Sequence, residues 1–208
     1  GFNNSTFSGN LKLAANEMNV NASIPDFTYD GKRFTNLDLV SKGTLDSLNA
    51  TISVTDIALS DSLHIPNTRL ILGAKNDLTH VQLTTSASKT VSEARLNANI
   101  KTLSDGVRIH LFPSSFILND KKWNLEKDGE ITLRKSYIEA KDVRFTQGEQ
   151  EIVIDTEPDD ESNRIDLVAK LRKVNINDFT PLFMNKPRLE GIITGKVKLK
   201  DPFGKQIV

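Results

Sequence analysis

The residues that most often carry chemistry are few and scattered in this chain. The three histidines, His64, His80 and His110, have no spacing that places two of them on one face as metal ligands. The acidic run from Glu157 to Glu161 lacks the alternating oxygen ligands and the glycine hinge of a calcium loop, so it predicts a solvated hairpin loop. We therefore expect neither a metal site nor a cofactor.

Nucleophiles and phosphate-binding loops are equally hard to find. Ser114 and Ser115 lack the glycine-flanked turn that exposes a hydrolase nucleophile. Gly191 and Gly195 lie inside a predicted strand rather than ahead of a helix, which argues against a phosphate loop. Trp123, the sole tryptophan, is predicted to be a core residue, and the chain has no cysteine. These patterns favour a protein that is not an enzyme.

The composition narrows the classes of partner. Of the 208 residues, 27 are Lys or Arg and 27 are Asp or Glu, so the formal net charge is zero. Nucleic-acid binding proteins usually carry a basic excess, and we expect no nucleic-acid partner. Apolar residues make up only 38% of the chain, which fits strands that bury one face.

Alternation of apolar and polar residues is the dominant pattern. Leu48, Ala50, Ile52 and Val54 alternate with small polar residues, and a period of two is typical of a strand with one dry and one wet face. The phase slips at Asp56, which predicts a bulge or a corner.

Similar segments recur along the chain and predict a dozen or more strands of an antiparallel meander. The one predicted helix is short and runs through Phe179, Leu182 and Phe183, with Asp178 as its N-cap. No linker divides the chain, so we expect a single β-rich module over 1–208, of all-β class with at most one short helix.

A wide sheet with one apolar face has to hide that face. It can close into a sandwich or barrel, or curl into an open groove that holds apolar cargo. In the second case the lining residues are predicted to be the apolar members of the most regular strands: Leu48, Ile52, Val54, Leu96, Ile100, Ile109, Leu111, Ile165, Leu167, Leu171, Val197 and Leu199.

Three segments resemble known sequences. The stretch from Leu189 to Leu199 resembles the strand with spaced glycines that recurs in the TamB and AsmA-like proteins of bacterial envelopes. The segment from Leu111 to Phe116, followed by Leu118, Asn119 and Trp123, resembles part of the TamB-like proteins of the Bacteroidetes type, and residues 34–39 fit their repeat style.

The resemblance implies a U-shaped antiparallel sheet with an apolar trough, a β-taco, in the periplasm. It further implies phospholipid transport between the two membranes, or outer-membrane protein assembly with a TamA-like partner. On this interpretation the chain is an internal fragment, and the inner-membrane anchor and the partner-binding region lie outside it.

We therefore expect a periplasmic envelope-biogenesis module that holds lipid acyl chains or unfolded client β-strands. The alternative is a non-catalytic surface or adhesion β-sandwich with a closed core. An open sheet also has two unpaired edges, which we expect near Leu13 and Leu199, where a client strand could pair.

Overall fold

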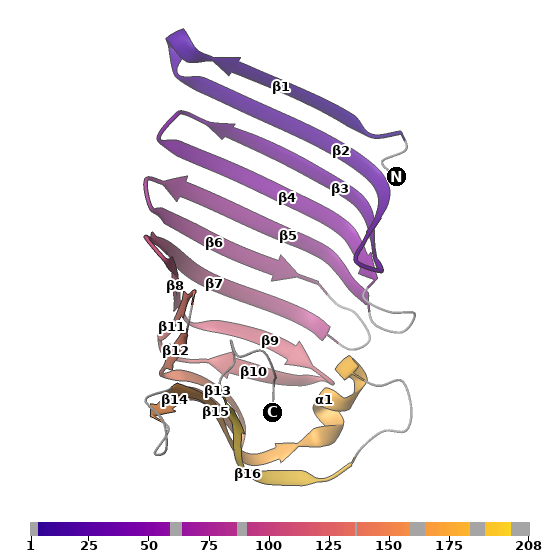
Figure 1. Ribbon diagram of the computed structural model, residues 1–208. Coiled ribbons are helices and arrows are strands. Elements are labelled where there is room, and N and C mark those ends of the chain that lie inside the picture. Colours follow the sequence, from indigo (N-terminus) through magenta and orange to yellow (C-terminus); the bar gives the residue numbers. More distant parts are fainter. Residues whose placement is uncertain are drawn as a thin grey trace. The chain divides into compact units, whose positions relative to one another are not determined.

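The computed structural model describes residues 4–58, 64–86, 91–135, 137–158, 165–183 and 190–200. Its strands form one antiparallel sheet that is not closed, together with a single short α-helix in the described residues (Figure 1). The prediction of an all-β antiparallel sheet with at most one short helix is thus confirmed. Contacts divide the chain into two compact units, which are described in turn.

Unit 1 comprises Gly1–Leu96 and Phe116–Asp120. Six strands follow one another as hairpins, with a 3₁₀ turn, Leu13–Ala15, between the first two. They are β1 (Thr6–Lys12), β2 (Glu17–Tyr29), β3 (Lys32–Gly43), β4 (Ser47–Ala58), β5 (His64–Lys75) and β6 (Leu78–Thr85), and β7 (Val91–Leu103) begins in this unit.

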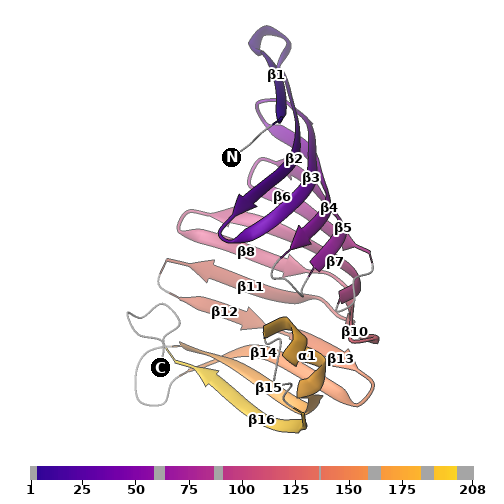
Figure 2. The same cartoon turned by 90° about the vertical axis from the view of Figure 1, so that its right-hand side faces the viewer.

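Unit 2 comprises Asn97–Ser115 and Lys121–Val208. Its strands are short at first and longer toward the C-terminal end, where they flank the helix α1 (Figure 2). The elements of the remaining chain are β8 (Gly106–Leu111), β9 (Ser114–Leu118), β10 (Lys121–Leu125), β11 (Gly129–Arg134), β12 (Ile138–Lys141), β13 (Val143–Gln147), β14 (Gln150–Pro158), β15 (Ile165–Asn175), α1 (Ile176–Phe183) and β16 (Ile192–Leu199).

The phase slip predicted at Asp56 coincides with a line of irregular residues across neighbouring strands. Asn36 in β3 and Asn67 in β5 have positive φ angles of 50° and 46°, a conformation that asparagine tolerates better than most residues. The registers between β2, β3, β4 and β5 continue unchanged past this line, so the extra residue of a β-bulge is absent there. A register shift of the bulge type occurs instead between Leu171 and Val174 of β15, beside Lys173 with a φ of 50°.

Candidate apolar binding face

The strand registers of unit 1 place apolar residues of six strands on one side of the sheet. In an antiparallel pair, residues directly opposite each other lie on the same face. One continuous row of opposite residues therefore crosses the unit from β1 to β6, and all of its members are apolar. The row is Phe7, Ala22, Leu39, Ile52, Leu70 and Leu83.

The neighbouring rows on this side are mostly apolar, with Ser41 and Thr79 as their polar members. Two further rows are Gly9, Val20, Ser41, Ala50, Leu72 and Val81, and Leu11, Met18, Gly43, Leu48, Ala74 and Thr79. We call this side the apolar face of unit 1. The other side carries rows such as Asn10, Asn19, Lys42, Asn49, Gly73 and His80.

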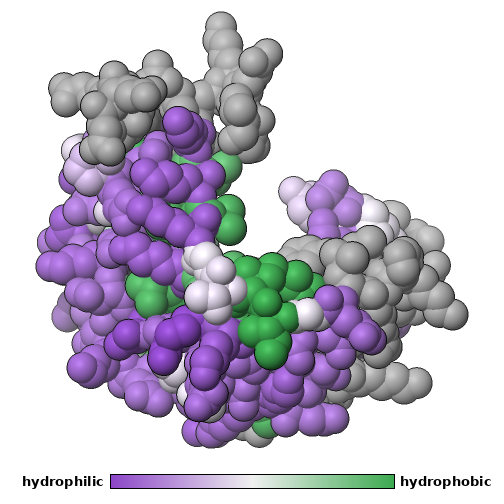
Figure 3. Space-filling model, turned by 90° about the horizontal axis from the view of Figure 1, so that it is seen from below, coloured by the Kyte–Doolittle hydropathy of each residue, from purple (hydrophilic) through white to green (hydrophobic). Residues whose placement is uncertain are grey.

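The apolar face of unit 1 is not sealed by a second layer of that unit. Its described residues contain no α-helix and no second sheet. Side chains at the β1 end are strongly exposed: Phe7 is 64% accessible, Leu11 60% and Val20 37%. The space-filling view shows hydrophobic side chains gathered in patches among hydrophilic surface (Figure 3). A one-layered sheet of this kind leaves apolar area available for a ligand.

Unit 2 has apolar rows of its own. Ile100, Ile109, Ile131 and Ala140 lie opposite one another across β7, β8, β11 and β12. A second row, on the C-terminal strands, consists of Leu125, Phe145, Ile152, Leu171 and Gly195. Gly195 has nothing within 4 Å of the position that a Cβ would take, so it leaves open space beside Leu171.

The helix α1 covers part of this apolar side in unit 2. Phe179 contacts Trp123 edge-on, with the ring centroids 5.3 Å apart, and Trp123 is fully buried. Asp178 is also fully buried, and Lys121 Nζ donates to both of its carboxylate oxygens at 2.8 and 2.9 Å. The ion pair and the ring contact hold the helix against β10.

The helix begins earlier than the sequence predicted. Asp178 is not its N-cap but lies in the first turn. Asn175 takes the capping role, because its side-chain oxygen accepts a hydrogen bond from the Asn177 backbone N–H at 3.0 Å. The buried pairing of Asp178 with Lys121, which sequence spacing does not reveal, explains why this carboxylate points into the unit.

The twelve residues predicted to line a groove all fall in the apolar phase of their strands, but their exposure differs. Val54 is buried, with only 6% of its surface accessible, whereas Leu96, Ile165 and Val197 are 36%, 39% and 57% accessible. The other members are half-buried: Leu48, Ile52, Ile100, Ile109, Leu111, Leu167, Leu171 and Leu199. In unit 1, Leu48, Ile52 and Val54 lie on one side of the single strand β4. In unit 2, the pairing of β15 with β16 brings together Leu167, Leu171, Val197 and Leu199.

Sequence reasoning missed the residues at the β1 end of the apolar face. Phe7, Leu11 and Val20 are its most exposed large side chains in unit 1. Alternation was visible around them, but only the cross-strand register shows that they extend the rows of Leu39 and Ile52.

Among the described strands, three pair with a single neighbour: β1, β16 and β12, which ends the branch formed by β8, β11 and β12. Leu199 belongs to the edge strand β16, as expected. Leu13 does not belong to a strand, because it begins the 3₁₀ turn that follows β1. The N-terminal edge is therefore Thr6–Lys12.

Other chemically suggestive residues have structural partners. His64 Nδ1 lies 2.8 Å from Asp56, and His110 Nε2 lies 3.0 Å from Asp128. Ser114 Oγ accepts the Asn97 backbone N–H and donates to the carbonyl of Phe112, so this hydroxyl stabilises a strand junction. In the described part of the chain, no three His, Cys, Asp or Glu side chains are grouped as a metal site.

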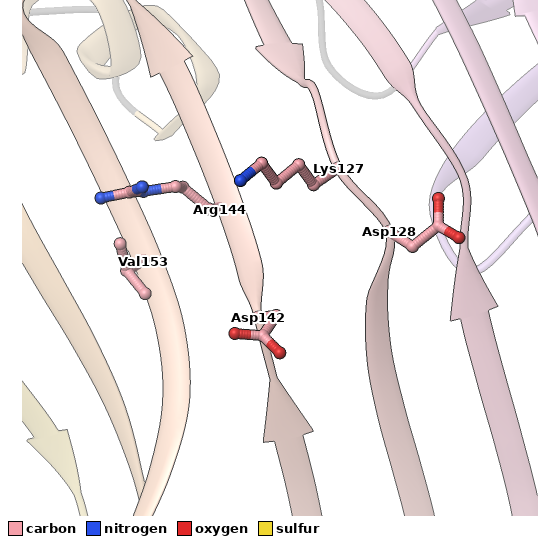
Figure 4. A pocket seen from close by; sticks show the side chains of 5 residues that line it. All are labelled: Lys127, Asp128, Asp142, Arg144 and Val153. Carbon is pink, nitrogen blue, oxygen red and sulfur yellow. The ribbon is translucent and has the colours of Figure 1, made fainter.

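A pocket of about 520 Å³ lies in unit 2 between the strands that follow Lys127 and Asp142. Its other lining residues include Asp128, Arg144 and Val153, and the close-up shows the Lys127 side chain extended toward the strand of Arg144 (Figure 4). Arg144 already forms an ion pair with Glu151. With cations and carboxylates mixed, the pocket has no clear charge preference.

Part of the acidic run belongs to a strand rather than to a loop. Glu157 is in β14 and forms ion pairs with Lys170 at 3.0 Å, with Lys198 at 3.8 Å and with Lys196. Hydrogen bonds from Lys196 and then Lys170 lower the pKa of Glu157 to about 2. Residues 159–161 lie outside the described residues.

This lowered pKa predicts an acid-sensitive attachment of β16. A carboxylate with a depressed pKa stabilises the fold above its unfolded pKa of roughly 4.3, and the contribution is lost as the pH falls toward the folded value. We expect the protection of β16 amides, measured as the exchange rate relative to the intrinsic rate at each pH, to fall between pH 4.5 and about 2, and Glu157→Gln to abolish most of that fall. An equal loss of protection in the variant and the wild type would show that other carboxylates hold this edge.

No helix in the described residues has the length and apolarity needed to span a membrane. Comparisons with protein-family models, with curated proteins and with solved structures find no match.

Proposed function

We propose that this protein holds lipid acyl chains against the apolar face of its sheet, and that it does so as a binding protein without catalysis. The observation that carries the proposal is the set of apolar rows in unit 1, which run across six strands with no covering layer in the described residues of that unit. An adhesion sandwich is built from two packed sheets, and the single layer formed by the described strands of unit 1 favours the open face instead.

An acyl chain suits such a face on physical grounds. Soluble proteins rarely expose large contiguous apolar patches unless a ligand or partner covers them. Each methylene removed from water contributes about 0.8 kcal/mol, so a single chain in contact over several residues would bind well. Because apolar contact is non-directional, the chain could also slide along a row without losing specific bonds.

The resemblance to TamB and AsmA-like proteins supports a periplasmic location for this lipid-binding activity. We propose that the protein is located in the periplasm and contributes to phospholipid transport or to outer-membrane assembly, with a TamA-like protein as an outer-membrane partner. Client β-strands, the other cargo that the resemblance implies, would be detected as peptide adducts in the experiment below.

Photo-crosslinking tests the cargo directly. A benzophenone amino acid is placed on the apolar side, at Ile52 in β4 or at Leu167 in β15. The matched controls carry it on the opposite side of the same strand, at Ser53 in β4 or at Lys170 in β15. After irradiation in cells, we expect lipid adducts at Ile52 and Leu167 and none at the controls. Equal labelling on both sides of the sheet, or none at all, would contradict the proposal.

Native mass spectrometry of the purified protein supplies an independent readout. We expect co-purified species with phospholipid masses that dissociate on mild activation. Protein without bound lipid, combined with peptide adducts in the crosslinking experiment, would assign the apolar face to client strands instead.

A further inference from the structure

The pocket of unit 2 coincides with a gap in the ladder of its sheet. Residues 126–129 lie against residues 142–144 without pairing to them, so one segment carries an extra residue, as in a β-bulge. Bulges redirect side chains and are common beside functional sites. The pairs that flank the gap are Leu125 with Phe145, and Glu130 with Lys141.

The backbone around this gap is closely packed. A Cβ on Gly129 would be 3.1 Å from the Asp142 carbonyl oxygen and from the Val143 Cα, so the two segments approach each other closely here. Val143 is only 1% exposed. Asp142 has a positive φ of 55°, which departs from the extended strand conformation. The lining side chains therefore project from a well-defined framework.

The pocket opens on the polar side of the sheet. Arg144 lies opposite Val153, and Val153 lies opposite Lys170 of the next strand. The apolar row that contains Phe145 and Ile152 is on the other side. A compound in this pocket is therefore surrounded by polar groups and water, and it does not compete with acyl chains on the apolar side.

Two of the charged side chains that line the pocket already have partners. Asp128 lies 3.0 Å from His110 Nε2, and Figure 4 shows its carboxylate directed away from the other lining residues. Arg144 forms an ion pair with Glu151. Because a guanidinium group carries several N–H donors, Arg144 retains donors for a further acceptor.

The other two charged side chains have no partner. In the part of the chain that the structure describes, Lys127 and Asp142 form no hydrogen bond or ion pair with each other or with another residue. The ammonium group of Lys127 points toward the strand of Arg144, and Asp142 precedes that strand (Figure 4). The pocket thus presents an available cation and an available carboxylate from two neighbouring segments.

We propose that this pocket binds a small zwitterion with a phosphate and a primary ammonium group, of the O-phosphoethanolamine type. Lys127 and Arg144 bind the phosphate, because ammonium and guanidinium groups form strong charge-assisted hydrogen bonds with phosphate oxygens. Asp142 accepts hydrogen bonds from the ammonium group of the ligand. The volume of about 520 Å³ is sufficient for such a compound. This binding is independent of the proposed acyl-chain binding, because it uses the polar side of the sheet.

Isothermal titration calorimetry at low ionic strength tests the recognition of both groups. We expect O-phosphoethanolamine to bind at least about fivefold more tightly than inorganic phosphate or ethanolamine alone, since each of these satisfies one side of the pocket. Phosphocholine should bind more weakly than O-phosphoethanolamine, because its quaternary ammonium group has no N–H to donate to Asp142.

Two variants separate the contributions of the cation and the carboxylate. Lys127→Gln should weaken binding of both phosphate and O-phosphoethanolamine at least about threefold, whereas Asp142→Asn should only remove the preference for O-phosphoethanolamine over phosphate. Asparagine tolerates a positive φ, so the second variant keeps the backbone conformation. The matched controls are Lys122→Gln, in β10, and Asp120→Asn, at an exposed aspartate with a φ of 58°. Both lie outside the pocket lining and should bind as the wild type does.

Vesicles distinguish a soluble ligand from a lipid headgroup. We expect phosphatidylcholine vesicles with and without phosphatidylethanolamine to retain the protein equally, which assigns the pocket to a soluble compound. Selective retention by phosphatidylethanolamine that both variants lose would support the same recognition, with the lipid headgroup as its source. Selective retention that both variants keep would overturn the assignment to Lys127 and Asp142.

The calorimetry also has outcomes that would overturn the proposal. These are an absence of binding by O-phosphoethanolamine, an equal affinity for inorganic phosphate, and variants that bind as the wild type does. A loss of affinity in the control variants as large as that in Lys127→Gln and Asp142→Asn would overturn it as well, because general surface charge would then explain the binding.

Discussion

Replacing Ile52 with glutamate is expected to lower the affinity for acyl chains at least about tenfold, since an acyl chain over this position would have to desolvate a carboxylate. Ile52 lies in the middle of the fully apolar row, between Leu39 and Leu70. The bound lipid is quantified by native mass spectrometry, and the affinity is measured by displacement of a fluorescent fatty acid.

The control is Ser53→Glu, which introduces the same charge one position along β4 on the opposite side of the sheet. It should bind as the wild type does. Because Ile52 is only half-buried, we expect Ile52→Glu to remain folded, and its far-ultraviolet circular dichroism should match that of the control. Folded Ile52→Glu protein with unchanged affinity would show that cargo does not cover this row.

The sequence predicted well which residues of each strand share a face, because alternation is a local property. Leu48, Ile52 and Val54 were identified as one face from their own strand, and the structure keeps them on one face. What alternation cannot supply is the lateral partner of each residue. The exposed Phe7 joins the row of Ile52 only through the registers of the intervening hairpins, and these depend on turns and on every pair along the strands.

Two kinds of feature could not be predicted from the sequence for a different reason. The left-handed residues Asn36 and Asn67 sit inside strands, where sequence rules expect extended backbone, so their alignment across the sheet was not foreseen. The position of α1 depends on Lys121 and Asp178, which are 57 residues apart, and on the contact of Trp123 with Phe179. Such long-range pairs leave no periodic signal in a single sequence.

The second prediction with a large effect concerns the part of unit 2 that helix α1 covers. Trp123→Ala is expected to lower the free energy of unfolding of this unit by about 3–5 kcal/mol, since it removes a fully buried tryptophan and leaves a cavity under Phe179. The measurement is urea unfolding followed by circular dichroism, with amide exchange to locate the change. Exchange should rise first in α1 and in β10.

The matched control for this prediction is Val197→Ala, on the same side of the sheet but 57% exposed, where truncation should change stability by less than about 0.5 kcal/mol. A large effect at Trp123 with a small one at Val197 would mean that the helix seals one end of the apolar side and leaves the other end unfilled. If Val197→Ala proved as destabilising as Trp123→Ala, the protein itself would have to cover Val197 in solution. Cargo would then have no free surface at this edge, and the lipid-binding proposal would rest on unit 1 alone.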